Sequence, residues 1–477
     1  MLFNSYLFIL FFLPLTVILY YTVGKRRNCT GAKLVLLLAS YIFLGYANLL
    51  FPLILLLSTV CNHLISLKIR AGRSKDRLWM TLGILFNVAL LIFFKYTNFL
   101  VDSFNQVFHL NLPTLQLFLP LGISFYTFQQ IAFLVDTARG EVPATGFLDY
   151  CLFTAYFPKV LQGPIVYHNE LLPQFRDCVR NGFDSSRFSA GLMAFAIGLS
   201  KKVLLADNFG KIVDFGFGHI SSLNSFEAIL VFVGYSLQIY FDFSGYCDMA
   251  IGISQMLNIE LPVNFNSPYK ANNINDFWKR WHITLTRFLT KYIYIPLGGN
   301  RKGKARTYRN IMIVFLISGL WHGAGYTFII WGALHGAASI LYRFSKRFFD
   351  RIPHFLQWSI TFVFVSFAWT FFRAGSLSDA LRLLNRIFAG GFGVNAELTE
   401  TMLQPFLLNV PSQILPFDLV ILGFYLIAVL SVALLKNSND LILSFHPNAK
   451  TWLFTFVLLI MSILSISGVS TFLYSNF

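Results

Sequence analysis

The chain has 477 residues, of which 56% are hydrophobic and only 12% are charged. Soluble proteins carry about 25% charged residues, so this composition excludes a soluble globular protein and indicates an integral membrane protein. The formal net charge of +16 is concentrated in short loops between apolar runs. Membrane topology explains that pattern, and we therefore expect no nucleic-acid partner.

A helix needs about 20 apolar residues to cross the hydrocarbon core of a membrane. Runs of this kind predict an all-α polytopic protein with roughly ten to twelve spans, near residues 3–22, 34–49, 50–67, 79–95, 116–135, 188–206, 226–258, 309–325, 326–343, 357–373, 416–435 and 452–473. The first run lacks a basic leader and a small-residue cleavage site, so we expect a retained span.

Loops with clustered basic residues should face the cytoplasm. The clusters are Lys25, Arg26 and Arg27; Lys68, Arg70, Arg73, Lys75 and Arg77; Arg301, Lys302, Lys304, Arg306 and Arg309; and Arg343, Lys346, Arg347 and Arg351. Lys95, at the outer end of its span, fits this topology only if its side chain is buried or reaches the interface. Five scattered cysteines predict free thiols and no disulfide framework.

Two stretches interrupt the simple pattern of spans. The run from Phe226 to Asn258 would be about 50 Å long as one helix, so we expect it to bend or fold back near Ser244 and Gly245. The segment "YFPKVLQGPIVYH", residues 156–168, contains two prolines and is too short to cross. Broken backbone at membrane depth needs protein or water around it, which predicts a re-entrant element lining a cavity, with a surface hairpin as the alternative.

Two carboxylates, Asp242 and Asp248, lie inside the long run. A charged group at membrane depth is costly unless it is paired or hydrated. Ion or proton translocation, a polar wall for a hydroxylated acceptor, and hydrogen bonding between helices all remain open for this pair.

The stretch "NNINDFWKRWHITLTRFLTKYIYIPLGGNRKGK" is rich in aromatic and basic residues. Asn275 and Asp276 predict a helix start, and the apolar spacing predicts one buried face, formed by Trp278, Trp281, His282, Leu285, Phe288 and Leu289. We expect an interfacial helix with its tryptophans at headgroup level and His282 facing the protein. The basic stretch Arg301–Arg309 suits either an anionic thioester donor or acidic lipid headgroups.

A histidine occupies the middle of "SGLWHGAGYTF", residues 318–328. His322 lies thirteen residues beyond Arg309, which corresponds to a depth of roughly 20 Å. His335, on the returning helix, lies roughly 12 Å from the same side. Intramembrane ionisable residues are functional candidates, although a neutral imidazole bonded to a neighbouring helix is the simpler interpretation. Gly323 and Gly325 should end or kink the helix and leave space beside the ring.

Outside the spans, the loop 374–415 contains "DALRLLNRIF", whose amphipathic pattern predicts a helix lying on the outer surface or receiving a partner. The sequence has no Walker-type phosphate loop, no HExxH and no GxSxG motif. A hydrolase or an ATPase is therefore disfavoured.

The stretches "YFDFSGYCDMAIG", "NFNSPYKANNINDFWKRWHITLTRFLTKYIYIPLGGNRKGK" and "SGLWHGAGYTFIIWGALHG" together resemble the core of the membrane-bound O-acyltransferases. The bacterial branch with the alginate O-acetylation membrane subunit is the most similar, and "SFYTFQQIAFLVD" and "YFPKVLQGPI" extend the resemblance upstream. It implies one membrane-embedded acyltransferase domain over residues 1–477, with the motif-bearing core at about 116–375 and a cavity across the membrane.

By this resemblance His322 is expected to be the catalytic histidine and His282 the second family histidine. The supporting or substrate-binding positions would be Trp321, Trp281, His335, Asp242 and Asn266. We expect no metal and no bound cofactor.

The implied activity is transfer of an acetyl group from a cytoplasmic thioester, acetyl-CoA, to hydroxyls of an extracellular or cell-envelope polysaccharide. Transfer would be direct or through an extracytoplasmic acetyltransferase partner, in the bacterial cytoplasmic membrane among its lipids. His322 would act as general base on the acceptor hydroxyl, and His282 would orient the donor or stabilise charge on the carbonyl oxygen. D-alanyl transfer to teichoic acid and a non-enzymatic transporter or channel are the alternatives.

Overall fold

The computed structural model describes residues 1–24, 29–72, 75–177, 182–394, 417–466 and 472–473. Within these ranges the regular secondary structure is entirely helical. Several sequence features lie outside the described residues: Lys25, Arg26, Arg27, Arg73, Cys178 and residues 395–415 of the long loop. The four described cysteines, Cys29, Cys61, Cys151 and Cys247, are free thiols, as expected.

The elements follow one another along the chain as helices joined by short connections. The first half contains η1 (Phe8–Phe12), α1 (Leu13–Gly24), α2 (Cys29–Gly45), α3 (Leu50–Arg70), α4 (Asp76–Leu91), η2 (Ile92–Tyr96), α5 (Thr97–Phe108), α6 (Ile123–Ala138), α7 (Phe147–Ala155), α8 (Phe157–Val160), α9 (His168–Asp177), α10 (Ser185–Ser200), η3 (Lys201–Ala206), α11 (Asp207–Gly218) and η4 (Ile220–Ser222). The second half contains α12 (Ser225–Met256), η5 (Pro268–Lys270), α13 (Ile274–Arg280), α14 (Ile283–Leu289), η6 (Thr290–Tyr294), α15 (Lys304–His322), α16 (Tyr326–Phe349), α17 (His354–Arg373), α18 (Leu377–Arg386), α20 (Phe417–Leu434), α21 (Ser438–Leu443) and α22 (Ala449–Leu464).

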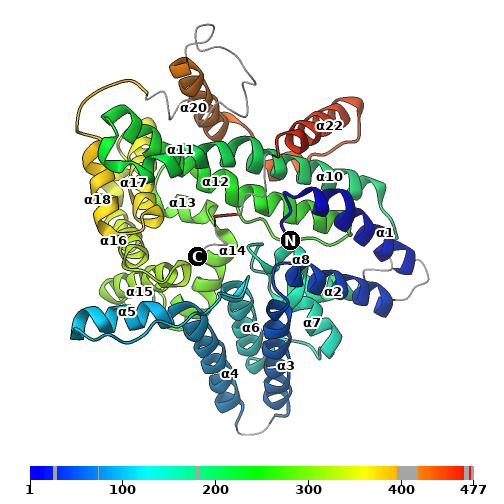
Figure 1. Ribbon diagram of the computed structural model, residues 1–477. Coiled ribbons are helices and arrows are strands. Elements are labelled where there is room, and N and C mark those ends of the chain that lie inside the picture. Colours follow the sequence, from blue (N-terminus) through cyan, green and yellow to red (C-terminus); the bar gives the residue numbers. More distant parts are fainter. Residues whose placement is uncertain (25–28, 73–74, 178–181, 395–416, 467–471, 474–477) are drawn as a thin grey trace.

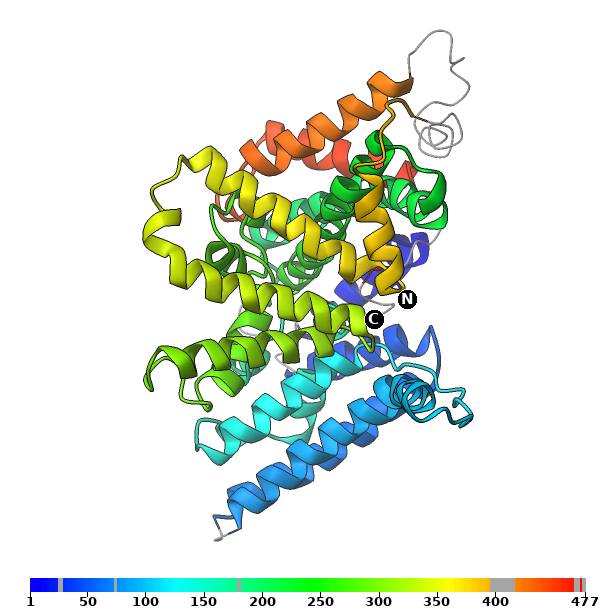
Figure 2. The ribbon, with the colours of Figure 1, turned by 90° about the vertical axis from the view of Figure 1, so that its left-hand side faces the viewer.

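Five helical stretches among the described residues are long and apolar enough to cross a membrane: Leu50–Arg70, Asp76–Phe108, Ser185–Gly218, Ser225–Met256 and His354–Arg373. Shorter apolar helices add Phe8–Gly24, Cys29–Gly45, Leu419–Leu434 and Ala449–Leu464. The expected spans at 309–325 and 326–343 correspond to α15 and α16, which pack against each other. Figure 2 shows α15, α16 and α17 side by side.

The long helix α12 is continuous through Ser244 and Gly245, where we expected the chain to bend or fold back. It runs without interruption from Ser225 to Met256, so the chain does not fold back there. Gly245 instead allows close packing, because a Cβ there would lie 2.8 Å from the carbonyl oxygen of Gly198 in α10. Protein covers most of α12, which lies between α10 and α13 in Figure 1, so a helix longer than one bilayer crossing is accommodated.

The two carboxylates in the middle of α12, Asp242 and Asp248, are neutralised by the π-helical element η3. Lys202 Nζ lies 2.7 Å from Asp242 Oδ1, and Lys201 Nζ lies 2.6 Å from Asp248 Oδ2. The backbone N–H of Leu473 also donates to Asp242 Oδ2 at 3.0 Å. These contacts give the two buried carboxylates structural partners, because a buried charge is tolerated when it is paired and hydrogen-bonded.

The proline-containing segment 156–168 is buried in the protein, which excludes the surface hairpin. It consists of the short helix α8 followed by non-helical backbone, and Phe157, Lys159 and Ile165 are all buried. The Nζ of Lys159 donates to Gln129 Oε1 at 2.5 Å. A small cavity beside Lys159 and Pro164 holds a volume of about 10 Å³. The segment is thus enclosed by protein, and the re-entrant element stays a prediction.

Two amphipathic helices complete the fold. The expected surface helix is α18, which buries Ala380 and Leu383 and exposes Leu381. Helix α5 turns away from α4 and projects from the body of the protein in Figure 1, and it is seen end-on in Figure 2.

Candidate active site

His322 is the last residue of α15. The helix ends there because Gly323, at the C-cap, has an extended backbone, as the glycines of the motif predict. The imidazole is buried, and its centroid lies 4.8 Å from that of Trp321, 5.1 Å from Trp331 and 5.2 Å from Phe372. An aromatic wall contributed by α15, α16 and α17 therefore surrounds the ring.

Glycines allow the helices that carry these aromatic side chains to pack closely around His322. A Cβ on Gly319 would lie 2.3 Å from the carbonyl oxygen of Phe328, and one on Gly332 would lie 2.4 Å from that of Phe315. A Cβ on Gly323 would come within 2.1 Å of the Phe328 ring. The backbones of α15 and α16 can approach this closely only because small residues occupy the interface.

His282 sits at a break between two short helices. The continuous interfacial helix expected from the apolar spacing is wrong, since α13 ends at Arg280 and α14 begins at Ile283. The side chain of Asn273, and not that of Asn275 or Asp276, caps α13. His282 adopts a left-handed backbone with φ of 45°. Non-glycine residues rarely adopt this conformation, and it is often found at functional sites.

The ring of His282 is fully buried and is held by Asn264. Its Nδ1 lies 3.2 Å from Asn264 Oδ1. The same oxygen accepts a hydrogen bond from the backbone N–H of Thr284 at 3.1 Å, which identifies it as the amide oxygen. Because this atom can only accept, Nδ1 of the neutral ring must carry the proton and Nε2 must carry the lone pair. Nε2 is buried and has no hydrogen-bond partner among the described residues.

The tryptophans of this stretch are buried and do not lie at headgroup level. Trp281 is 1% exposed, and its ring centroid lies 5.6 Å from Phe277 and 4.9 Å from Trp369. The helix break turns Trp281 into the core beside His282. The apolar spacing predicts one helix face, whereas it arises from two short helices that both face the core.

His335 lies in the aromatic core behind the two other histidines. Trp278 Nε1 donates to its Nδ1 at 3.3 Å, so the neutral ring carries its proton on Nε2. Trp331 separates it from His322, with ring-centroid distances of 5.1 Å to His322 and 4.9 Å to His335.

The structure brings together only some of the expected residues. The centroids of His282 and His322 are 6.3 Å apart, and Trp321, whose Nε1 donates to Ser124 O at 3.1 Å, lies against both rings. Asp242 is bound instead to Lys202. Asn266 is exposed and pairs through its backbone with Arg280, so Asn264 is the asparagine of "NFNSPY" that contacts a histidine.

A cavity of about 430 Å³ lies beside α15, lined mainly by apolar side chains that include Trp278 and Phe315, and also by Ser318. Ser318 is one helical turn before His322. A second cavity of about 540 Å³ shares the wall formed by Asn275, Lys279 and Arg343 and adds Lys346. An apolar inner part and a basic mouth suit a long ligand with an anionic end.

Comparison with known proteins identifies the family. The profile of the membrane-bound O-acyltransferase (MBOAT) family matches residues 78–377, which contain both histidines of the site. The chain belongs to this family. It is therefore a membrane-bound O-acyltransferase, and MBOAT proteins of bacteria are its relatives.

Three curated relatives show the range of the MBOAT chains that it resembles. It is 42% identical to a peptidoglycan O-acetyltransferase of Helicobacter pylori over 100% of this chain and 98% of the relative. It is 38% identical to a Pseudomonas aeruginosa protein named "Probable alginate O-acetylase AlgI" over 89% of this chain and 81% of the relative. A teichoic acid D-alanyltransferase of Bacillus subtilis is 27% identical over 53% of this chain and 68% of the relative.

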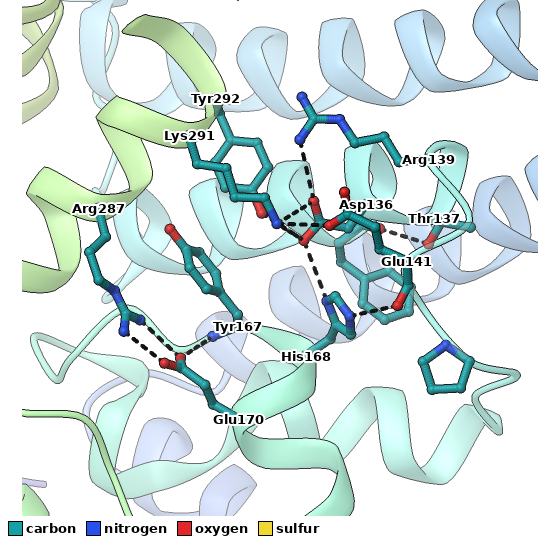
Figure 3. Close-up of polar contacts among 12 residues, drawn as sticks. Asp136, Thr137, Arg139, Glu141, Tyr167, His168, Glu170, Arg287, Lys291 and Tyr292 are labelled. Carbon is teal, nitrogen blue, oxygen red and sulfur yellow. Dashed lines mark hydrogen bonds and ion pairs between the residues drawn. The ribbon is translucent and has the colours of Figure 1, made fainter. Parts of the chain in front are cut away.

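A network of ion pairs and hydrogen bonds anchors η6, which follows His282 in the chain (Figure 3). Lys291 in η6 lies 3.0 Å from Asp136 and 2.9 Å from Glu141, and Tyr292 Oη donates to Asp136 at 2.7 Å. Burial raises the pKa of Asp136, but hydrogen bonds from His168, Tyr292 and Lys291 outweigh it and hold the pKa below its usual value. The end of α6 and the segment after His282 are thereby fixed to each other.

Two residues that contact the histidines were missed from the sequence. Asn264 has no distinguishing signal beyond its neighbour Asn266. Lys95 did have one, a lysine inside an apolar span, and its Nζ donates to the carbonyl oxygens of Trp321 and His322. In the part of the chain that the structure describes, no three His, Cys, Asp or Glu side chains are placed to bind a metal.

Proposed function

We propose that this MBOAT enzyme transfers acetyl from acetyl-CoA in the cytoplasm to hydroxyls of a cell-envelope or extracellular glycan, directly or through an extracytoplasmic acetyltransferase partner. The observation that carries the proposal is the ring-centroid distance of 6.3 Å between His282 and His322, together with two adjoining cavities, one lined by Ser318 of the helix that carries His322 and the other by basic side chains. The names of the two more similar relatives, one acting on peptidoglycan and one on alginate, support acetyl as the acyl group.

The two adjoining cavities are the proposed path of the donor. Lys279, Arg343 and Lys346 at the mouth would bind the phosphates of the nucleotide end, since charge-assisted hydrogen bonds are the strong ones. The apolar inner part would take the pantetheine arm. Ser339 lines that part, and its hydroxyl is buried without a partner among the described residues, so it can bind an amide of the arm. Because basic loops face the cytoplasm, the donor would enter from the cytoplasmic side of the bacterial membrane.

His322 is the proposed general base. The acceptor oxygen attacks the carbonyl carbon of the thioester while its proton moves to a ring nitrogen of His322. When the tetrahedral intermediate collapses, the C–S bond breaks and the proton passes to the leaving thiolate. Atoms and charges balance without a metal or a further cofactor.

The structure supports only one of the two roles that the sequence leaves open for His282. The neutral ring held by Asn264 has a lone pair at Nε2, so it can accept a hydrogen bond from a substrate N–H or O–H but cannot donate one to a carbonyl oxygen. Of the two expected roles, this geometry supports orienting a substrate and not stabilising the oxyanion.

Transfer of radiolabelled acetyl by inverted membrane vesicles tests the proposal. Vesicles with the wild-type protein should move label from external acetyl-CoA to protein or glycan, and vesicles with equal amounts of folded His322→Ala should not. Equal labelling by the two would refute His322 as base. Labelling from a D-alanyl donor and none from acetyl-CoA would favour the activity of the Bacillus subtilis relative.

A further inference from the structure

The junction between α4 and α5 contacts the end of the helix that carries His322. The junction is the π-helical turn η2, residues Ile92–Tyr96. π-Helical turns are rare in proteins, and those that occur are often found at functional sites. Two consecutive side chains of this turn, Lys95 and Tyr96, reach the C-terminal end of α15.

The last carbonyl groups of a helix have no partner within the helix. In α15 the carbonyl of Gly319 accepts from the N–H of Gly323, which leaves those of the final three residues. The hydroxyl of Tyr96 donates to Leu320 O. Lys95 Nζ donates to Trp321 O at 2.6 Å and to His322 O at 3.0 Å. The carbonyl groups of the last three residues of α15 are thus fixed by two side chains of one turn.

The ammonium of Lys95 has no donor left for a substrate. It carries three N–H groups, and the third donates to Ser124 Oγ at 3.3 Å. The carbonyl of Ser124 in turn accepts from Trp321 Nε1 at 3.1 Å, which closes a loop of contacts between α6, η2 and α15. Among the described residues Lys95 forms no ion pair with a carboxylate. Its charge is therefore directed at the negative end of the α15 dipole.

We propose that Lys95 is a positioning residue, which fixes the backbone at Trp321 and His322 and so holds the His322 imidazole at reacting distance from the acceptor hydroxyl. This inference rests on the proposed role of His322 as base. A proton acceptor at a frayed helix end would move by an ångström or more, and a misplacement of about 1 Å can cost on the order of 10²-fold in rate.

The test compares kcat and KM of purified Lys95→Met and Lys95→Arg in acetyl transfer. Lys95→Met keeps the apolar stem and removes all three donors, so kcat should fall on the order of 10²-fold with the KM for acetyl-CoA unchanged. Lys95→Arg keeps the charge and the donors, and should recover most of the lost kcat. If Lys95→Met does not accumulate as folded protein, Lys95→Gln replaces it. It loses the charge and keeps two donors, so its kcat should lie below that of Lys95→Arg with the KM unchanged, and wild-type kcat would overturn the proposal.

Lys33→Met is the matched control. Lys33 Nζ pairs with Asp149 at 2.6 Å between α2 and α7, so this variant also removes a partly buried ammonium but leaves α15 untouched. Its kcat should equal that of the wild type. Wild-type kcat in Lys95→Met, or a loss that Arg does not restore and that comes with a raised KM, would overturn the proposal.

The double variant separates this inference from the proposed function. If Lys95 acts through His322, then His322→Ala with Lys95→Met should be no slower than His322→Ala alone, because coupled residues are not additive. A further drop would overturn the positioning role. High activity in His322→Ala, by contrast, would refute the base itself, whatever the Lys95 variants do.

Discussion

The two histidines of the site are held in opposite ways. His322 ends a long helix, and the contacts that fix it reach its backbone, from Lys95, and enclose its ring with aromatic side chains. His282 lies between two short helices in a left-handed conformation, and the contact that fixes it reaches its ring, from Asn264. The contacts of His322 fix the position of its ring, whereas the contact of His282 fixes which ring nitrogen carries the proton. That difference suits a base that must move a proton and a neighbour that must only accept a hydrogen bond.

The first prediction concerns the ring contact of His282. Asn264→Leu removes the acceptor that keeps the proton on Nδ1, and kcat should fall by about 10- to 100-fold, since a ring with the wrong tautomer loses its hydrogen bond to the substrate. Asn264→Asp keeps an acceptor and should lose less. Steady-state acetyl transfer by the purified variants measures both.

Asn266→Ala is the control for that comparison, because Asn266 belongs to the same loop but is exposed. It should retain wild-type kcat. Equal losses in the Asn264 and Asn266 variants would show that the loop, and not the Asn264–His282 contact, matters.

The donor path predicts a change in KM without a change in kcat. Arg343→Ala removes a cation at the mouth of the cavity, and the KM for acetyl-CoA should rise about tenfold, the worth of one charge-assisted hydrogen bond. Arg347→Ala, an exposed cation on the same helix that does not line the cavity, should leave KM unchanged. Initial rates over a range of acetyl-CoA concentrations decide this, and equal KM values in both variants would contradict the proposed path.

Close packing behind His322 predicts a loss of stability. Gly319→Ala would force a Cβ to within 2.3 Å of backbone in α16, and should lower the free energy of unfolding by about 1–3 kcal/mol. Gly423→Ala in α20, where a Cβ meets nothing within 4 Å, should leave stability the same or raise it. Thermal unfolding in detergent measures both, and an unchanged melting temperature for Gly319→Ala would refute the tight contact.

The smallest predicted effect is a pH dependence at the Asp136 network in Figure 3. The pKa of Asp136 lies below its unfolded value of about 3.9, so its contribution to stability is present above that value and is lost as pH falls through the folded pKa. Between neutral pH and pH of about 3, the melting temperature of Asp136→Asn should therefore fall less steeply than that of the wild type.

Asp102→Asn serves as the control, because Asp102 is exposed on α5 and is absent from the ion pairs of the described residues. It should follow the wild-type slope. If Asp136→Asn follows it too, the network does not contribute through the charge of Asp136.

The sequence predicted well what local pattern determines. The apolar runs predicted the helical membrane fold, and the glycines after His322 predicted the end of α15. The sequence-based predictions were wrong where contacts between distant parts of the chain determine the local structure. The 3.6-residue spacing around His282 continues across a helix break, because two short helices that face one core preserve it.

The same limit explains the other differences. Nothing local distinguishes Asn264 from Asn266, since only the packing of the loop decides which one points inward. Gly245 suggested a bend in α12, whereas the neighbouring helix α10 uses it for close approach. The position of Lys95 conflicts with a simple span, and its two carbonyl partners, more than two hundred residues away along the chain, resolve the conflict.

The most direct test of the two-histidine account is a side-by-side measurement of kcat for His282→Gln and His322→Gln at matched amounts of folded protein. A glutamine carbonyl can accept a hydrogen bond but cannot take up a proton as a general base. The account predicts that His282→Gln retains a measurable fraction of the wild-type kcat, while His322→Gln loses about 10²- to 10⁴-fold, the contribution of a general base. Equal losses, or a greater loss in His282→Gln, would contradict it.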